Sequence, residues 1–333
     1  EHHNLFSGVV LVARGDRVLF NRVYGLADTG SGREASTETP FRIGSVGKML
    51  TAVAVLNLAR QHRIDLDAPI ATYLSSYPAR VADQVTARHL LTHTSGIELD
   101  DYEPFVRAVD EAESLEDIIA AQALYIEHLN EGRYADFHPL DSFDYSNEEY
   151  DLLGAILQSV TRRPWHQAVR DLVLTPAGAH DVWFAPPPQA AVGYTLRDAD
   201  GDWGYDLHNS TGMLRSLARP AGSQFATANA LFHFMRYVER NRTDAVFDEA
   251  TSPQIDQGES FGVQLGYGFG FETERHACYR AYGHGGVEAG VSAVARYYPE
   301  SQLTIIVLAN RDGEAFDVAR FIERSLNPVC TAE

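Results

Sequence analysis

The sequence predicts an α+β fold in which helices flank an antiparallel sheet, an α/β sandwich, and three observations support it. Residues 7–13 and 17–24, near the N-terminus, are rich in β-formers. Further β-rich segments follow beyond residue 265, whereas the apolar spacing between them is helical. We therefore expect residues 1–66 and 223–333 to form one α/β sheet subdomain and residues 67–222 to form an inserted, mainly helical subdomain.

The individual elements follow from local signals along the chain. Arg14-Gly15-Asp16 is a favourable hairpin turn between the first two strands, and an adhesion role for this tripeptide has little weight. Val46 to Ala59 is rich in helix formers and apolar on most faces, which predicts a buried helix with Ser45 at its N-cap. Downstream we expect helices over 85–93, 114–129, 147–160, 223–240 and 314–325, one beginning with Pro164 at N1, and strands over 266–272, 278–283, 291–298 and 303–310.

Composition excludes several classes of function. The chain of 333 residues is 45% hydrophobic, yet no apolar run is long enough to cross a bilayer. Its net charge of −19 argues against nucleic acid and anionic membrane surfaces as partners. The sequence begins at Glu1 without a signal-peptide pattern, so location stays open, with an exported (periplasmic or secreted) enzyme favoured over a cytoplasmic one. A disulfide between Cys278 and Cys330 and two free thiols fit equally well.

Lys48 is the only lysine in the chain, although 27 residues are basic. It follows Ser45 by three positions, and positions i and i+3 share one helix face, so its amine is expected to reach the serine hydroxyl. A serine hydroxyl needs a base to become a good nucleophile, and a buried lysine, unlike an arginine, can lose its proton. The pair therefore predicts nucleophilic catalysis, with a capping serine and a surface lysine as the alternative.

Two further motifs would complete such a site. Tyr145-Ser146-Asn147 precedes a predicted helix, and it offers a phenol that can carry a second proton and an amide that can bind a substrate amide. His284-Gly285-Gly286 follows a predicted strand, and its glycines allow a substrate backbone to approach the sheet edge. Taken singly, the first motif also fits an N-cap beside a buried aromatic ring, and the second fits a tight turn.

In the order Ser-x-x-Lys, Tyr-x-Asn, His-x-Gly, these motifs resemble the serine β-lactamase-like family. That family includes class C β-lactamases, D-alanyl-D-alanine carboxypeptidases, related esterases and D-aminopeptidases, and some acyltransferases. The resemblance covers essentially the whole chain and implies a β-lactamase/transpeptidase-like form of the predicted fold. It is carried by residues 40–45, 90–96, 145–150, 282–286 and 308–310.

The resemblance also implies a role for each motif residue. Ser45 would be the acylated nucleophile, and Lys48 and Tyr145 would share a proton network. The backbone N–H groups of Ser45 and Val287 would form the oxyanion hole.

Three other positions are implied in substrate binding. Asn147 would bind the substrate amide, His284 would orient Tyr145 or a substrate carboxylate, and Gly286 would permit close approach. Histidine here replaces the lysine of the β-lactamase motif, which removes a permanent cation and weakens the case for substrates with a C-terminal carboxylate.

We therefore expect a serine hydrolase that cleaves an ester or amide bond through a Ser45 acyl-enzyme, as an esterase, D-peptidase or β-lactamase-like enzyme. An acyltransferase using the same acyl-enzyme is one alternative, and a non-catalytic binding or sensor protein on this fold is another. No cofactor or metal is expected, because His89 and His93 lack a His-Glu-x-x-His pattern and are interpreted as helix-end and packing residues. The expected partner is a small-molecule or peptide ester or amide, whereas substrate identity, β-lactam turnover and oligomeric state stay open.

Overall fold

The computed structural model describes residues 6–99, 102–128, 137–140, 142–197, 203–214 and 218–326. Its centre is an eight-stranded antiparallel sheet in the order β10-β11-β12-β13-β14-β15-β1-β2. The strands come from the two ends of the chain, so the predicted α+β class is confirmed, while the division into subdomains stays a prediction. They are β1 (Gly8–Arg14), β2 (Arg17–Tyr24), β10 (Ile255–Ser260), β11 (Val263–Tyr267), β12 (Glu272–Arg275), β13 (Arg280–Glu288), β14 (Val291–Tyr298) and β15 (Leu303–Ala309).

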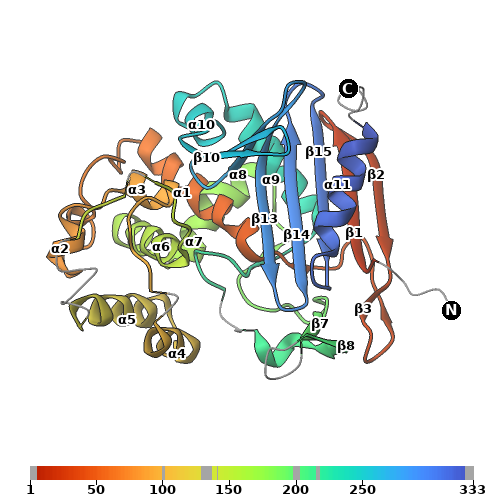
Figure 1. Cartoon of the computed structure of the whole chain (residues 1–333), viewed down its shortest axis with the longest axis horizontal. Coiled ribbons are helices and arrows are strands. Elements are labelled where there is room, and N and C mark those ends of the chain that lie inside the picture. The colour runs from red at the N-terminus through yellow and green to blue at the C-terminus, as the bar shows by residue number, and fades with distance from the viewer. Residues whose placement is uncertain are drawn as a thin grey trace.

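Helices cover both faces of this sheet, because its central strands are apolar on both sides. Along β1, Val9 and Leu11 pack into the larger cluster with α1 (Gly47–Arg60) and α9 (Ala228–Asn241). Val10 and Val12, which alternate with them, pack on the opposite face towards α11 (Glu314–Leu326). Figure 1 shows α11 lying across β14 and β15, with the helical part of the chain beyond β13.

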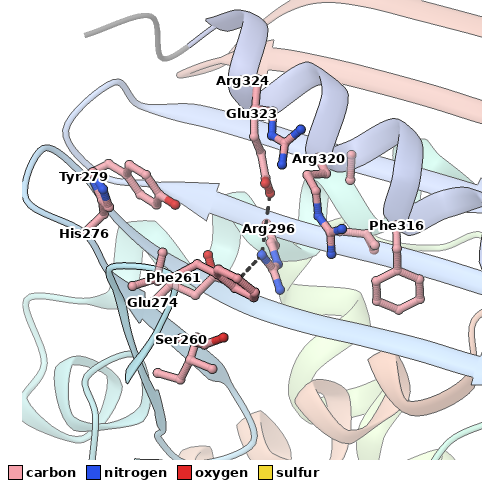
Figure 2. A pocket seen from close by; sticks show the side chains of 14 residues that line it. Ser260, Phe261, Glu274, His276, Tyr279, Arg296, Phe316, Arg320, Glu323 and Arg324 are labelled. Atoms are coloured by element: carbon pink, nitrogen blue, oxygen red, sulfur yellow. Dashed lines mark hydrogen bonds and ion pairs between the residues drawn. The ribbon is translucent and has the colours of Figure 1, made fainter. Parts of the chain in front are cut away.

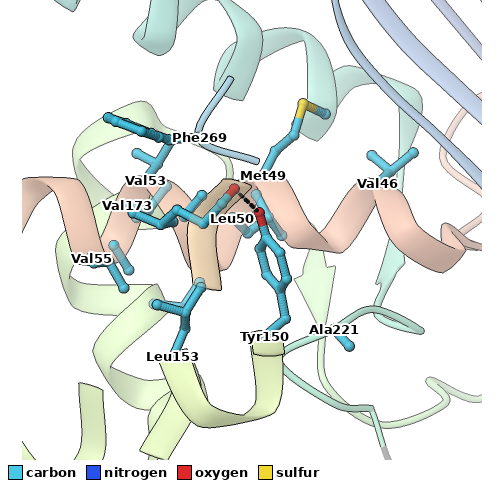
Figure 3. Packing of buried hydrophobic residues seen from close by; sticks show 14 of the residues in the cluster. Val46, Met49, Leu50, Val53, Val55, Tyr150, Leu153, Val173, Ala221 and Phe269 are labelled. Carbon is cyan, nitrogen blue, oxygen red and sulfur yellow. Dashed lines mark hydrogen bonds between the residues drawn. The ribbon is translucent and has the colours of Figure 1, made fainter. Parts of the chain in front are cut away.

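The helical part packs around α1, whose residues from Gly47 to Leu58 are all buried. Figure 3 shows Met49, Leu50 and Val53 of α1 beside Tyr150 and Leu153 of α6 (Asn147–Thr161). The Tyr150 hydroxyl donates a hydrogen bond to the Leu91 carbonyl oxygen at 3.2 Å, which satisfies its only polar group in this apolar setting. The remaining helices are α2 (Ala79–Ala82), α3 (Ala87–Thr92), α4 (Glu103–Glu111), α5 (Leu115–His128), α6 (Asn147–Thr161), α7 (Trp165–Val169), α8 (Thr175–Ala177) and α10 (Ala245–Ala250).

Short strands outside the main sheet connect that sheet with the helical part of the chain. A three-stranded sheet has the order β5-β9-β6, and two further pairs join β3 to β4 and β7 to β8. The first of these sheets brings the residues just before Ser45 next to those just before α9. Their bounds are β3 (Leu26–Asp28), β4 (Arg33–Glu34), β5 (Phe41–Arg42), β6 (Val182–Trp183), β7 (Tyr194–Arg197), β8 (Trp203–Asn209) and β9 (Phe225–Ala226).

Two sheet predictions were wrong in their bounds. The strand expected over 266–272 is interrupted: residues 266–267 end β11, residue 272 begins β12, and 268–271 form a turn between them, in which Gly268 N–H donates to the Phe271 carbonyl and Gly270 adopts φ 80°. β13 continues to Glu288, so His284-Gly285-Gly286 lies within this strand and not after it.

Two helix starts also differ from the sequence prediction. Helix α9 begins at Ala228 and not at residue 223, because the Thr227 side chain accepts a hydrogen bond from Ala230 N and caps it. Pro164 is the N-cap of α7 and not its first helical residue.

Two further findings concern membrane spans and cysteines. Across the described residues, the helices are all too short or too polar to span a bilayer. Cys278 is disulfide-bonded, and Cys330, the second cysteine of the sequence, lies outside the described residues.

Candidate active site

Ser45 lies in a 3-10 turn, Gly44–Val46, that leads directly into α1. The prediction that Ser45 is the N-cap was therefore wrong: Val46 holds that position, and no side chain caps the helix. Gly44 makes the turn possible because its φ of 49° is a conformation that side chains disfavour. The consequence is that Ser45 Oγ does not serve as a helix cap.

Lys48 is fully buried one turn later, and its ammonium is held by oxygen atoms from three parts of the chain. Its Nζ lies 3.2 Å from Ser45 Oγ, 2.7 Å from Asn147 Oδ1 and 2.8 Å from the Ala221 carbonyl oxygen. In the neutral amine form, two N–H groups would still serve Asn147 and Ala221, and the lone pair would face Ser45 Oγ. This geometry suits a group that exchanges a proton with the serine.

Tyr145 reaches the same serine from the segment before α6. Its hydroxyl donates a hydrogen bond to Ser45 Oγ at 2.8 Å, and Lys48 Nζ lies 4.6 Å from its ring centroid. Asn147 is the first residue of α6, with Ser146 as the N-cap, so its side-chain oxygen can face Lys48. The structure thus brings three of the predicted residues, Ser45, Tyr145 and Asn147, around a fourth, Lys48.

Strand β13 passes so close to the Ser45 turn that only glycine fits at Gly286. A Cβ on Gly286 would lie 2.1 Å from the Ile43 carbonyl oxygen and 3.0 Å from Ser45 N. From the other side, a Cβ on Gly44 would lie 3.0 Å from Val287 N. The N–H groups of Ser45 and Val287, which are proposed to form the oxyanion hole, therefore lie on either side of this close contact between β13 and the Ser45 turn.

His284 is buried on β13, and its hydrogen bonds do not go to Tyr145. Its Nε2 is 3.1 Å from the Tyr267 hydroxyl, while its ring centroid is 6.4 Å from that of Tyr145. Burial lowers the pKa of His284, and the nearby Glu272 carboxylate only partly opposes this shift. A role in orienting Tyr145 would therefore act through ring packing.

A cavity of about 240 Å³ opens beside Ser45, and its charged lining was not predicted from the sequence. The Arg42 Nε atom lies 2.5 Å from Glu288 Oε2, and the other carboxylate oxygen of Glu288 accepts a hydrogen bond from the Ser223 hydroxyl. Arg219 pairs with the buried carboxylate of Asp151. No local sequence signal marks these pairs, because each joins residues more than 60 positions apart.

A larger cavity, about 760 Å³, lies elsewhere, between α11 and the β10–β12 strands. Figure 2 shows Arg296 at its centre, linked to Glu274 and Glu323, with Phe316 from α11 at one side. It shares no lining residue with the cavity at Ser45, so we do not include it in the candidate active site. Within the described residues, no three His, Cys, Asp or Glu side chains gather as metal ligands would.

Comparison with known proteins agrees with this geometry. The family model described as Beta-lactamase matches residues 1–326. The chain belongs to this family. Esterase EstB of Burkholderia gladioli is 36% identical over 198 residues, which are 57% of this chain and 50% of EstB. Penicillin-binding protein 4* of Bacillus subtilis (strain 168) is 26% identical over 330 residues, 92% of this chain and 68% of that protein. The match thus spans half the length of one relative and about two thirds of the other.

Solved structures share the fold of this β-lactamase family member. The penicillin binding protein from Bacillus halodurans superposes with a TM-score of 0.80 at 25% identity, covering 96% of this chain and 95% of that one. The D-amino acid amidase from Ochrobactrum anthropi SV3 gives a TM-score of 0.78 at 22% identity, covering 97% and 95%. The likeness to the amidase shows a shared fold.

Proposed function

We propose that this protein is a serine hydrolase that cleaves an ester or amide bond through an acyl-enzyme on Ser45. The observation that carries the proposal is the pair of contacts at Ser45 Oγ, 3.2 Å to Lys48 Nζ and 2.8 Å to the Tyr145 hydroxyl. A nucleophile with two proton carriers can lose its proton on attack and supply one to the leaving group. The named relatives include an esterase and a penicillin-binding protein, which agrees with this reaction class.

In the proposed acylation step, Ser45 Oγ attacks the substrate carbonyl carbon while its proton passes to the Lys48 amine. The resulting oxyanion accepts hydrogen bonds from the N–H groups of Ser45 and Val287. The C–O or C–N bond then breaks as the leaving group takes a proton through Tyr145, which leaves an ester on Ser45. Water then attacks the carbonyl carbon of that ester while its proton passes to the same network. The bond between that carbon and Ser45 Oγ breaks, Ser45 Oγ takes a proton back from the network, and the free acid leaves.

The charged residues of the cavity support an uncharged substrate at this site. Arg42 and Arg219 both engage carboxylates of the protein, Glu288 and Asp151. The third motif offers buried His284, whose lowered pKa keeps it neutral at neutral pH. Among the described residues, a substrate carboxylate would therefore meet no dedicated cation of the kind that the lysine of the β-lactamase motif supplies.

A serine-directed phosphonate tests the proposal by intact-mass spectrometry. We expect the wild-type protein to gain one adduct on Ser45, Ser45→Ala to gain none, and Ser31→Ala, an exposed control, to behave like wild type. Lys48→Arg should slow adduct formation by about 10²-fold or more, because a guanidinium does not accept a proton. An active Lys48→Arg enzyme would remove the base assignment.

The same assay separates hydrolase from the two alternatives. Absence of any adduct with phosphonates, β-lactams, D-amino acid amides and short-chain esters would support a non-catalytic protein. If acylation occurs, adding an amine or alcohol acceptor distinguishes the other two. Dominant formation of free acid supports the hydrolase, and dominant acyl transfer to the acceptor refutes it.

We also infer export of the protein, on the basis of the disulfide at Cys278. Disulfides persist in oxidising compartments and are rare in the cytosol. Alkylation of the protein taken directly from its source, without reductant, tests this inference. Labelling of Cys278 would contradict it.

A further inference from the structure

His93 occupies an unusual place directly after α3. Its backbone is left-handed, with φ 55° and ψ 49°, and its side chain is fully buried. A non-glycine residue in this region is strained, because its Cβ crowds the following carbonyl oxygen, and it persists where its surroundings hold it in place. The residues that contact His93 must therefore hold it in this conformation.

The residues before and after Tyr145 both donate a backbone hydrogen bond to His93. The Asp144 N–H donates to the His93 carbonyl oxygen at 2.8 Å, and the Ser146 N–H donates to His93 Nδ1 at 3.2 Å. The imidazole also packs against the phenol ring, with 4.4 Å between the centroids of His93 and Tyr145. One residue thus fixes the backbone on each side of Tyr145 and one face of its ring.

Glu149 holds the imidazole in turn. Its carboxyl group hydrogen-bonds His93 Nδ1, and its other oxygen accepts the Ser95 N–H at 3.0 Å. In the tautomer in which Nδ1 accepts the Ser146 N–H, Nδ1 carries no proton, the proton shared with Glu149 lies on the carboxyl group, and the two donors share the one Nδ1 lone pair. Burial agrees with this, since it raises the pKa of Glu149 and, together with the charge of Lys48, lowers that of His93.

We propose that His93, held by a neutral Glu149, is the positioning residue that places the Tyr145 hydroxyl on Ser45 Oγ. The inference rests on the proposed function of Tyr145 and Ser45, and it adds a part of the site that none of the three motifs contains. The Tyr145 side chain is 38% exposed, so packing around it leaves one side open, and the contacts with His93 supply the missing restraint. His93 does not touch the reacting atoms.

His93→Gly tests the proposal, because glycine retains the left-handed backbone and removes only the side chain. We expect kcat for a p-nitrophenyl ester to fall by about 10²-fold, the cost of a misplaced catalytic group, with KM within about threefold of wild type. His93→Asn should recover part of the loss, because its side-chain oxygen can occupy the place of Nδ1 and accept the Ser146 N–H. His62→Gly is the matched control, since His62 is exposed and has the same φ of 55°.

Variants of Glu149 test whether its carboxyl group and the His93 imidazole are both uncharged. Glu149→Gln can still donate to Nδ1 and accept from Ser95, so its kcat should stay within about threefold of wild type, whereas Glu149→Ala should resemble His93→Gly. If the Glu149→Gln enzyme is as impaired as Glu149→Ala, the inference that Glu149 and His93 are both uncharged is wrong.

Amide hydrogen exchange of the peptide covering residues 144–147 provides a readout that does not depend on activity. Exchange should accelerate in His93→Gly and not in His62→Gly. Unchanged exchange, or a kcat within twofold of wild type, would overturn the role of His93. If wild-type protein forms no acyl adduct, the proposed function fails, and the exchange experiment still decides whether His93 positions Tyr145.

Discussion

Tyr145→Phe removes one oxygen from the site and leaves the aromatic ring in place. The lost contact is the 2.8 Å hydrogen bond to Ser45 Oγ. The ring keeps its packing against His93 and its position beside Lys48 Nζ, 4.6 Å from the ring centroid. Because the residue is 38% exposed, the free energy of unfolding should fall by about 0.5 to 1.5 kcal/mol at most, the net value of one hydrogen bond.

The rate should respond much more strongly than stability. If the phenol carries the proton to the leaving group, its loss should lower kcat/KM by about 10² to 10⁴-fold. That range equals about 2.7 to 5.4 kcal/mol of transition-state stabilisation, which exceeds the expected loss of folding free energy by about twofold to tenfold. The ratio of the two effects therefore separates a catalytic group from a structural one.

Initial rates with a p-nitrophenyl ester and urea unfolding curves measure both quantities on the same variant. Tyr150→Phe is the control, because the buried Tyr150 hydroxyl bonds the Leu91 carbonyl and not Ser45. It should lose about 0.5 to 1.5 kcal/mol of stability, the net value of one hydrogen bond, because the Leu91 carbonyl oxygen still accepts the Gly270 N–H at 3.3 Å, and its kcat/KM should stay within about threefold of wild type. A Tyr145→Phe enzyme that keeps more than a third of wild-type activity would refute the reasoning.

Two further predictions follow from the contacts of Gly286 and His93. Gly286→Ala should abolish measurable ester hydrolysis, because its Cβ would lie 2.1 Å from the Ile43 carbonyl oxygen. Gly212→Ala, which meets no atom within 4 Å, should match wild type, and an active Gly286→Ala enzyme would contradict the close approach of β13. The pKa of His93 is lowered from 6.5 in the folded state, so its contribution to stability is present above pH 6.5 and is lost as pH falls through the folded value. Urea unfolding between pH 6.5 and 5 should therefore show a shallower pH dependence for His93→Asn than for wild type, by up to about 1.36 kcal/mol per pH unit, and equal slopes would show that His93 titrates normally.

Much of the fold could be predicted from the sequence because its signals are local. Arg14-Gly15-Asp16 joins β1 to β2 as expected, and β14 has the predicted bounds of Val291 and Tyr298. The errors arose where tertiary contacts decide the boundary. The aromatic and apolar residues around Gly268 and Gly270 have strand propensity, but the chain turns there against α1, where a Cβ on Gly270 would lie 2.5 Å from Ala52 Cβ.

For the candidate site, the sequence by itself determined the pair whose geometry is local. Ser45 and Lys48 are three residues apart, so the helical repeat alone brings their side chains together, and the absence of any other lysine draws attention to them. The motif resemblance selected Tyr145 and Asn147, and it gave no distances. Only the tertiary structure brought these side chains to Lys48, 99 residues from Asn147.

The remaining parts of the site depend on contacts that no local pattern records. His93 meets Ser146 across 53 residues, and Arg42 meets Glu288 across more than 200. The sequence presents His93 as one more helix-end residue, because its hydrogen bonds to both sides of Tyr145 exist only after α3 has packed against α6. Spacing along one helix is set by the backbone, whereas contacts between distant segments are set by how the whole chain packs.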